Sequence, residues 1–102
     1  MSNNFPARIR KLPAFDGPFD AFQLAADACR ILFASYPAGT VIDSHTHDTD
    51  NVGVITKGEL ILTLNGKTQR YTIGDWYHVP TRVEHSARFD RETEEIEFWF
   101  TV

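Results

Sequence analysis

The chain has 102 residues, with 42% hydrophobic and 24% charged side chains. This length suits one domain, and the composition excludes an intrinsically disordered protein. Ten basic and fourteen acidic residues give a net charge of −4, which disfavours nucleic acid or an anionic membrane surface as a partner. The one cysteine excludes an intramolecular disulfide and any multi-cysteine zinc module.

The sequence shows no secretory or membrane-spanning segment. Residues 1–6 lack the apolar core of a secretory signal peptide. The apolar runs are also shorter than the roughly 20 residues that a membrane-spanning helix needs. We therefore expect a soluble protein of the cytoplasm.

The first 23 residues differ in composition from the rest of the chain. Their helix-breaking residues are Pro6, Pro13, Gly17 and Pro18, and their phenylalanines are Phe5, Phe15, Phe19 and Phe22. Such residues interrupt a helix, yet the segment is too apolar for a free tail. The pattern predicts an extended arm over residues 1–23, packed on its own domain or on a second subunit, and a β-barrel domain over residues 24–102.

The remaining sequence predicts short strands separated by turns. The expected strands are residues 29–36, 51–56, 59–64, 67–73, 76–79, 85–89 and 95–101. Asn65-Gly66 is typical of a type I′ hairpin turn, because both residues tolerate positive φ. Residues 19–30 are rich in alanine but show no apolar helical stripe. This arrangement indicates an all-β protein, an antiparallel sandwich or barrel.

The last predicted strand has an apolar side and a polar side. Ile96, Phe98 and Phe100 alternate, so we expect them to face the core and Trp99 to face outward. An outward Trp99 fits a subunit interface, or packing beneath the N-terminal arm. Residues 90–95 are strongly acidic and are predicted to form a solvated turn.

The histidines carry the clearest chemical signal. His45 and His47 are two residues apart, so both imidazoles point the same way on an extended chain and can form a two-ligand clamp. Asn51 keeps the same parity, and His85 lies in a later strand from which it can supply a third ligand. Imidazole is the commonest nitrogen ligand of divalent transition metals.

These residues stand in a pattern that resembles the first motif of the cupin family, G-x5-H-x-H-x(3,4)-E-x6-G. The matching positions are Gly39, His45, His47, Asn51 and Gly58, and every spacing agrees. The departure is Asn51, which stands where the family usually carries glutamate.

A second stretch is similar to the second cupin motif, G-x5-P-x-G-x2-H-x3-N. It matches at Gly74, Pro80 and His85. Arg82 replaces the second glycine of the motif, and Phe89 replaces its final asparagine. Together the two motifs extend over about half of the chain.

The resemblance implies a cupin double-stranded β-helix, which is a conical antiparallel β-barrel with a jelly-roll-like course. It also implies a divalent metal ion inside the barrel, held at the positions of His45, His47, Asn51 and His85. Family members use iron, manganese, zinc, nickel or copper, and they include dioxygenases, isomerases and sugar-binding regulators. The resemblance therefore defines the site more narrowly than the reaction.

Asn51 changes the electrostatics of the predicted metal site. An amide oxygen is a neutral and weaker donor than a carboxylate, so three imidazoles and Asn51 add no negative charge to balance the ion. Asp48 and Asp50 have the opposite parity and are expected at the rim. The competing interpretation is a metal-free cupin, in which the histidines merely line a polar pocket.

Two functions remain open from the sequence. The first is a metal-binding protein that binds or transforms a small molecule inside its barrel, as a dioxygenase or isomerase would; His78, Tyr71 and Asp50 are the candidate general bases. The second is a non-enzymatic binding or sensing module. Small cupins commonly pair, so the resemblance also implies a homodimer.

Overall fold

The computed structural model describes residues 4–101 as one short helix and nine strands. The elements are α1 (Ala7–Arg10), β1 (Asp20–Ala26), β2 (Cys29–Tyr36), β3 (Thr40–His45), β4 (Thr49–Lys57), β5 (Glu59–Leu64), β6 (Lys67–Thr72), β7 (Trp76–Val79), β8 (His85–Phe89) and β9 (Thr93–Thr101). Within this described part, no helix is long and apolar enough to cross a membrane.

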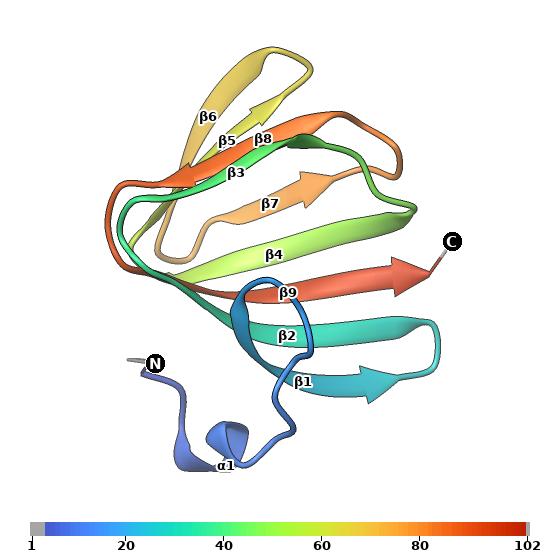
Figure 1. The fold of residues 1–102 in the computed structure, drawn as a ribbon, viewed down its shortest axis with the longest axis vertical. Helices are drawn as coiled ribbons and strands as arrows, with labels where there is room; N and C mark the ends of the chain where they lie inside the picture. Colours follow the sequence, from blue (N-terminus) through green and yellow to red (C-terminus); the bar gives the residue numbers. More distant parts are fainter. Residues whose placement is uncertain (1–3, 102) are drawn as a thin grey trace.

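Two antiparallel sheets face each other (Figure 1). One has five strands in the order β1-β2-β9-β4-β7, and the other has four in the order β3-β8-β5-β6. Apart from the hairpins β1-β2 and β5-β6, neighbouring strands in each sheet come from distant parts of the chain. The predicted all-β barrel is therefore confirmed.

Local turn chemistry sets several of the strand registers. Asn65 and Gly66 both have positive φ, +48° and +80°, and they join β5 to β6 with the tight turn that the sequence predicts. Ala28 also has a positive φ of +61°, at the turn between β1 and β2. Strand β1 was not foreseen, because its alanine-rich stretch carries no strand alternation of its own.

The N-terminal segment packs against the domain that follows it. The Phe5 ring makes an edge contact with Phe33, and Phe19 packs between Phe15 and Tyr36. Two features depart from the expected extended arm. The four residues of α1 form a helical turn between two prolines, since a single turn fits in that interval. The proposed arm boundary after residue 23 also lies inside β1, which begins at Asp20.

The apolar core lies between the two sheets, where Leu32, Ile55, Leu60, Val79 and Phe89 are almost completely buried. These side chains come from β2, β4, β5, β7 and β8, so the core joins both sheets. It occupies one part of the interior. Leu60, Val79 and Phe89 also line a cavity in the interior, which carries a few polar side chains.

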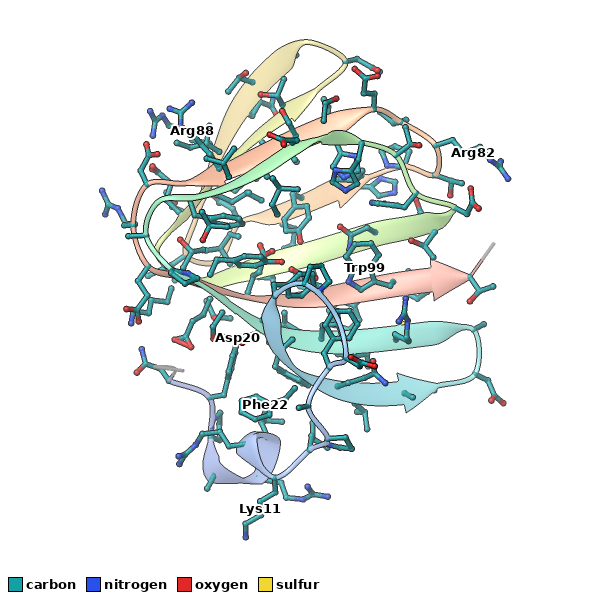
Figure 2. The ribbon with its side chains drawn as sticks, viewed as in Figure 1. Lys11, Asp20, Phe22, Arg82, Arg88 and Trp99 are labelled. Carbon is teal, nitrogen blue, oxygen red and sulfur yellow. The ribbon has the colours of Figure 1, made fainter. Side chains whose placement is uncertain are left out.

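The expected orientation of β9 is wrong. Glu95 and Glu97 are buried, at 3% and 2% exposure, whereas Phe100 on the alternate face is 41% exposed. Trp99 lines the interior cavity rather than the outer surface, and it can be located on β9 in Figure 2. The reason is that the interior side of this strand is polar, and tyrosine and indole donors satisfy the carboxylate of Glu97.

The acidic stretch at residues 90–95 is only partly a solvated turn. Glu94 is 1% exposed, and its two carboxylate oxygens accept hydrogen bonds from the backbone N–H of Asn4, at 2.9 and 2.8 Å. Glu95 is buried on the opposite, interior face. The strand thus begins at Thr93, earlier than the charged sequence predicts.

Candidate functional site

Strand pairing brings His45 and His85 together. They are direct cross-strand partners where β3 pairs with β8, just after a register irregularity that follows Ile42. Their ring centroids are 4.2 Å apart. The first motif and the second motif therefore meet through a backbone register, as the resemblance implies.

His47 lies beyond the end of β3, in the loop that leads to β4. Its ring centroid is 5.8 Å from that of His45 and 4.7 Å from that of His85. The Trp99 ring packs edge-on against it at 4.9 Å. The backbone carbonyl of His47 accepts a hydrogen bond from the N–H of Arg82 at 2.9 Å, so the second motif also holds the loop of the first.

All three imidazoles are oriented by the same kind of hydrogen bond. Each Nδ1 lies against a backbone carbonyl: His45 against Asp43 at 2.9 Å, His47 against Thr49 at 3.0 Å, and His85 against Val83 at 2.9 Å. A carbonyl oxygen only accepts, so each Nδ1 carries the proton in the neutral ring. Each Nε2 is then a lone-pair donor, which is the form that a metal ligand requires.

The residues present fit a divalent metal ion. One nitrogen from each imidazole lies within 4.8 Å of those from the other two. The Nε2 atom of His47 is buried and has no hydrogen-bond partner. A buried polar atom without a partner costs free energy, and coordination to an ion would remove that cost.

Burial also keeps His85 in its ligating form. Desolvation by burial, with smaller contributions from nearby His45 and His47, lowers the pKa of the His85 imidazole below its usual value. Its hydrogen bond to Val83 opposes this shift. At neutral pH the ring is therefore uncharged and free to donate its lone pair.

Asn51 lies on the interior face of β4, where it pairs with Trp99 of β9. It is 4% exposed and lines the same cavity. Its amide Nδ2 donates a hydrogen bond to the backbone carbonyl of Phe98 at 3.3 Å. This bond fixes the orientation of the amide and leaves Oδ1 as the atom that a ligand can use.

The other sequence candidates lie away from the three imidazoles. His78 is exposed and pairs with Asp50, with Nε2 and Oδ1 2.7 Å apart. Asp48 is 91% exposed and lies 3.7 Å from Arg82, consistent with the rim position expected for it. Tyr71 packs on Tyr77 and donates a hydrogen bond to Gln69, so none of the proposed general bases contacts the histidine group.

A cavity of about 360 Å³ lies between the two sheets. Its lining includes His45, His85 and Asn51 at the candidate metal site, and Glu95, Glu97 and Trp99 from β9. Most of the other lining side chains are aliphatic or aromatic. A mostly apolar cavity with a few converging polar groups is typical of a small-molecule site.

The family model for the cupin domain matches residues 32–101. This chain belongs to the cupin domain family. The match contains both motifs, so it confirms the resemblance drawn from the histidine and glycine spacing.

Solved cupins share the fold at low sequence identity. An RmlC-like cupin from Shewanella frigidimarina superposes with a TM-score of 0.81 at 20% identity, over 99% of this chain and 93% of the other. A salicylate 1,2-dioxygenase variant from Pseudoaminobacter salicylatoxidans, in complex with gentisate, gives a TM-score of 0.74 at 22% identity, over 86% of this chain and 27% of the other.

A curated relative belongs to a different functional class. The HTH-type transcriptional regulator PuuR of Escherichia coli is 30% identical over 57 residues, which is 55% of this chain and 31% of the regulator. The aligned region is thus about a third of that protein's length.

At Arg82, which replaces a glycine of the second cupin motif, the backbone keeps a conformation typical of glycine. This cupin has a φ of +63° at Arg82, in the left-handed region that glycine adopts without strain. The family motif carries glycine at this position, so the conformation is retained although the residue has changed. The Arg82 side chain extends outward, away from the barrel (Figure 2).

The cupin cavity also contains an acidic pair that the sequence analysis missed. Glu97 accepts hydrogen bonds from the Tyr36 hydroxyl at 2.5 Å and from Trp99 Nε1 at 3.0 Å. Glu95 lies next to it, and its Oε2 is buried without a hydrogen-bond partner. The one available signal was the Glu-x-Glu spacing, which puts both carboxyl groups on one face of a strand.

The pair shares its environment with two tyrosines. Burial raises the pKa of the Glu95 carboxyl well above its ordinary value, and the charge of Glu97 raises it further. Burial, and then the nearby carboxylates, likewise raise the pKa values of Tyr36 and Tyr77. At neutral pH the phenols therefore remain hydrogen-bond donors, and burial favours the protonated form of the Glu95 carboxyl group.

Proposed function

We propose that this cupin domain holds a divalent metal ion with His45, His47 and His85, and that it binds a small molecule beside the ion inside the barrel. The observation that carries the proposal is the common orientation of the rings. Three Nδ1 atoms are committed to backbone carbonyls, and the buried Nε2 of His47 has no partner.

Asn51 is the proposed fourth ligand through Oδ1. The hydrogen bond from Nδ2 to Phe98 supports this role, because it directs the donor end of the amide away from the cavity. With three imidazoles and one amide, the protein adds no charge to the ion. A bound divalent ion would act as a Lewis acid toward an oxygen atom of the ligand.

Anomalous scattering from a crystal, recorded on both sides of the iron, nickel, copper and zinc absorption edges, tests this proposal. The expected result is one anomalous peak within bonding distance of all three Nε2 atoms, about 2.1 Å. A featureless map in crystals grown with excess metal would contradict it. The edge at which the peak appears also identifies the metal.

A non-enzymatic sensing role is the second candidate. The specific observation that favours it is the partial match to a transcriptional regulator. A sensor returns its ligand unchanged, whereas an enzyme converts it. Mass spectrometry of a bound small molecule, before and after prolonged incubation with metal-loaded protein in air, separates the two roles.

We also propose a homodimer, formed by the outer face of the five-stranded sheet. A row of apolar cross-strand partners, Leu24, Ile31, Phe98 and Val52, crosses four of its strands. Trp76 on the last strand is 59% exposed and packs against Phe98. A second copy would cover these side chains, which replace Trp99 as the basis of the expected pairing.

A further inference from the structure

Two carboxyl groups are buried in the cavity at a considerable energetic cost. Removing a carboxylate from water costs several kcal/mol, and well-packed apolar residues of similar volume often give a more stable protein than a buried ionic group does. Glu97 offsets part of this cost through Tyr36 and Trp99. Glu95 does so less completely, because its Oε2 has no hydrogen-bond partner.

The unpartnered oxygen is the part of this cluster that indicates a ligand. Glu95 is 3% exposed, lines the cavity, and keeps Oε2 free of any protein donor. Native proteins rarely leave a buried carboxyl oxygen unsatisfied. A group that enters the cavity and donates hydrogen bonds would satisfy Oε2 and use the lone pairs that remain on Glu97.

The side chains that line the cavity indicate what kind of hydrogen-bond donor would bind there. No lysine or arginine is among the described residues that line the cavity, so a ligand anion would find no side-chain cation at the end that holds Glu95 and Glu97. A hard metal ion needs about six oxygen ligands, whereas this end of the cavity has two carboxyl groups and phenols that act as donors. The aromatic rings of Tyr36, Tyr77 and Phe89 also line it, and such rings attract organic cations.

We propose that Glu95 and Glu97 form an ammonium-binding subsite, which selects small molecules that carry a primary amine. In the bound state both carboxylates would face one cation, so a proton held by Glu95 would leave to the solvent. The groups that face Glu95 in this step are Glu97, Tyr36 and Tyr77.

This subsite rests on the proposed function, because it would bind the end of the same small molecule that lies away from the metal ion. Trp99 packs on His47, and Glu97 precedes Trp99 by two residues on the same face of β9. Two residues of a strand span about 6.6 Å. A ligand with an oxygen donor at one end and an amine a few bonds away would reach both the histidines and the acidic pair.

Three matched four-carbon probes test the subsite, namely butylamine, butanol and butyrate. Each is titrated calorimetrically at neutral pH into the protein as purified and into chelator-treated protein. We expect butylamine to bind at least about tenfold more tightly than butanol, about 1.4 kcal/mol, and butyrate not to bind the chelator-treated protein. Glu97→Gln should remove the preference for the amine and leave the affinity for butanol unchanged.

Glu94→Gln is the control, since Glu94 is equally buried on the same strand but bonds Asn4 outside the cavity. It should keep the amine preference. Titration in two buffers that differ in protonation enthalpy should report about one proton released per butylamine in the wild type, and none in Glu95→Gln.

Equal affinities for butylamine and butanol in the wild type would overturn the subsite, whether or not any variant folds. Retention of the preference in both Glu95→Gln and Glu97→Gln would overturn it too. If the protein never takes up metal but the chelator-treated protein still prefers the amine, the metal site is refuted and the amine subsite is supported. If the protein binds metal but shows no preference for the amine, the subsite is refuted and the metal site is supported.

Discussion

The backbone N–H of Arg82 donates a 2.9 Å hydrogen bond to the carbonyl oxygen of His47, and it does so from a left-handed conformation with a φ of +63°. The turn that contains Arg82 therefore holds the loop that positions a candidate metal ligand. A side chain at this φ costs roughly 1 kcal/mol compared with glycine. The molecule keeps the geometry of the cupin motif although it has lost the glycine.

We expect Arg82→Gly to stabilise the folded protein by about 1 kcal/mol, because it removes this strain and preserves the backbone hydrogen bond. The ion pair with Asp48 is lost, but both side chains are highly exposed and the pair contributes little. Denaturant unfolding measures the change. Arg88→Gly, within strand β8, is the control and should destabilise by a similar amount. Equal destabilisation by both variants would show that Arg82 is not strained.

The sequence predicted the parts of the fold that depend on short-range signals. The Asn65-Gly66 turn has a local physical cause and was predicted correctly. His45 and His47 do come close together, but His47 lies in the loop after β3 and not on the extended strand that the prediction assumed. The approach of His85 required a register between β3 and β8 that no local pattern specifies. The family motif supplied that long-range information.

The failure on β9 has a definite cause. Alternating apolar residues usually mark the face that points to the core, so Ile96, Phe98 and Phe100 were assigned inward. This rule assumes an apolar interior, whereas the cavity on this side is polar. Glu97 is stable there because Tyr36, far away in the sequence, donates to it, and a single sequence does not reveal such a partner.

Asn51→Glu should raise metal affinity by about an order of magnitude or more, about 1.4 kcal/mol for each factor of ten. A carboxylate adds a direct attraction between charges in a partly dry barrel. Isothermal titration of zinc, manganese and nickel into chelator-treated protein measures the change, and melting temperature in excess metal should rise with it. Asn51→Gln, which lengthens the side chain without adding charge, should show no gain. No improvement with any of the three ions in Asn51→Glu would place Asn51 outside the metal site.

The raised pKa of Glu95 predicts a pH dependence of stability. Between the unfolded-state pKa, about 4.3, and the higher folded-state pKa, the folded protein binds one more proton than the unfolded chain. The contribution of Glu95 to stability therefore falls as the pH rises through this window. Glu95→Gln does not titrate, so its melting temperature relative to the wild type should increase from about pH 5 to about pH 8. A constant difference for Glu95→Gln would mean that the pKa of Glu95 is not raised in the folded protein.

Light scattering should return about 23 kDa at micromolar concentration, twice the 11.6 kDa of one chain. We expect Phe98→Lys to shift the protein to the monomer, because it puts a charge into the apolar row of the five-stranded sheet. Ile73→Lys is the control: Ile73 is 69% exposed but lies in the turn after β6, on the other sheet, and its variant should stay dimeric. A wild-type mass of about 12 kDa would refute the dimer.

The most direct test of the metal site is elemental analysis of purified wild type, His47→Ala and His78→Ala. His47 supplies a buried, unpartnered Nε2, whereas His78 is exposed and pairs with Asp50. The account predicts divalent metal in the wild type and in His78→Ala, and loss of most of it in His47→Ala. Equal metal content in all three folded proteins would contradict it.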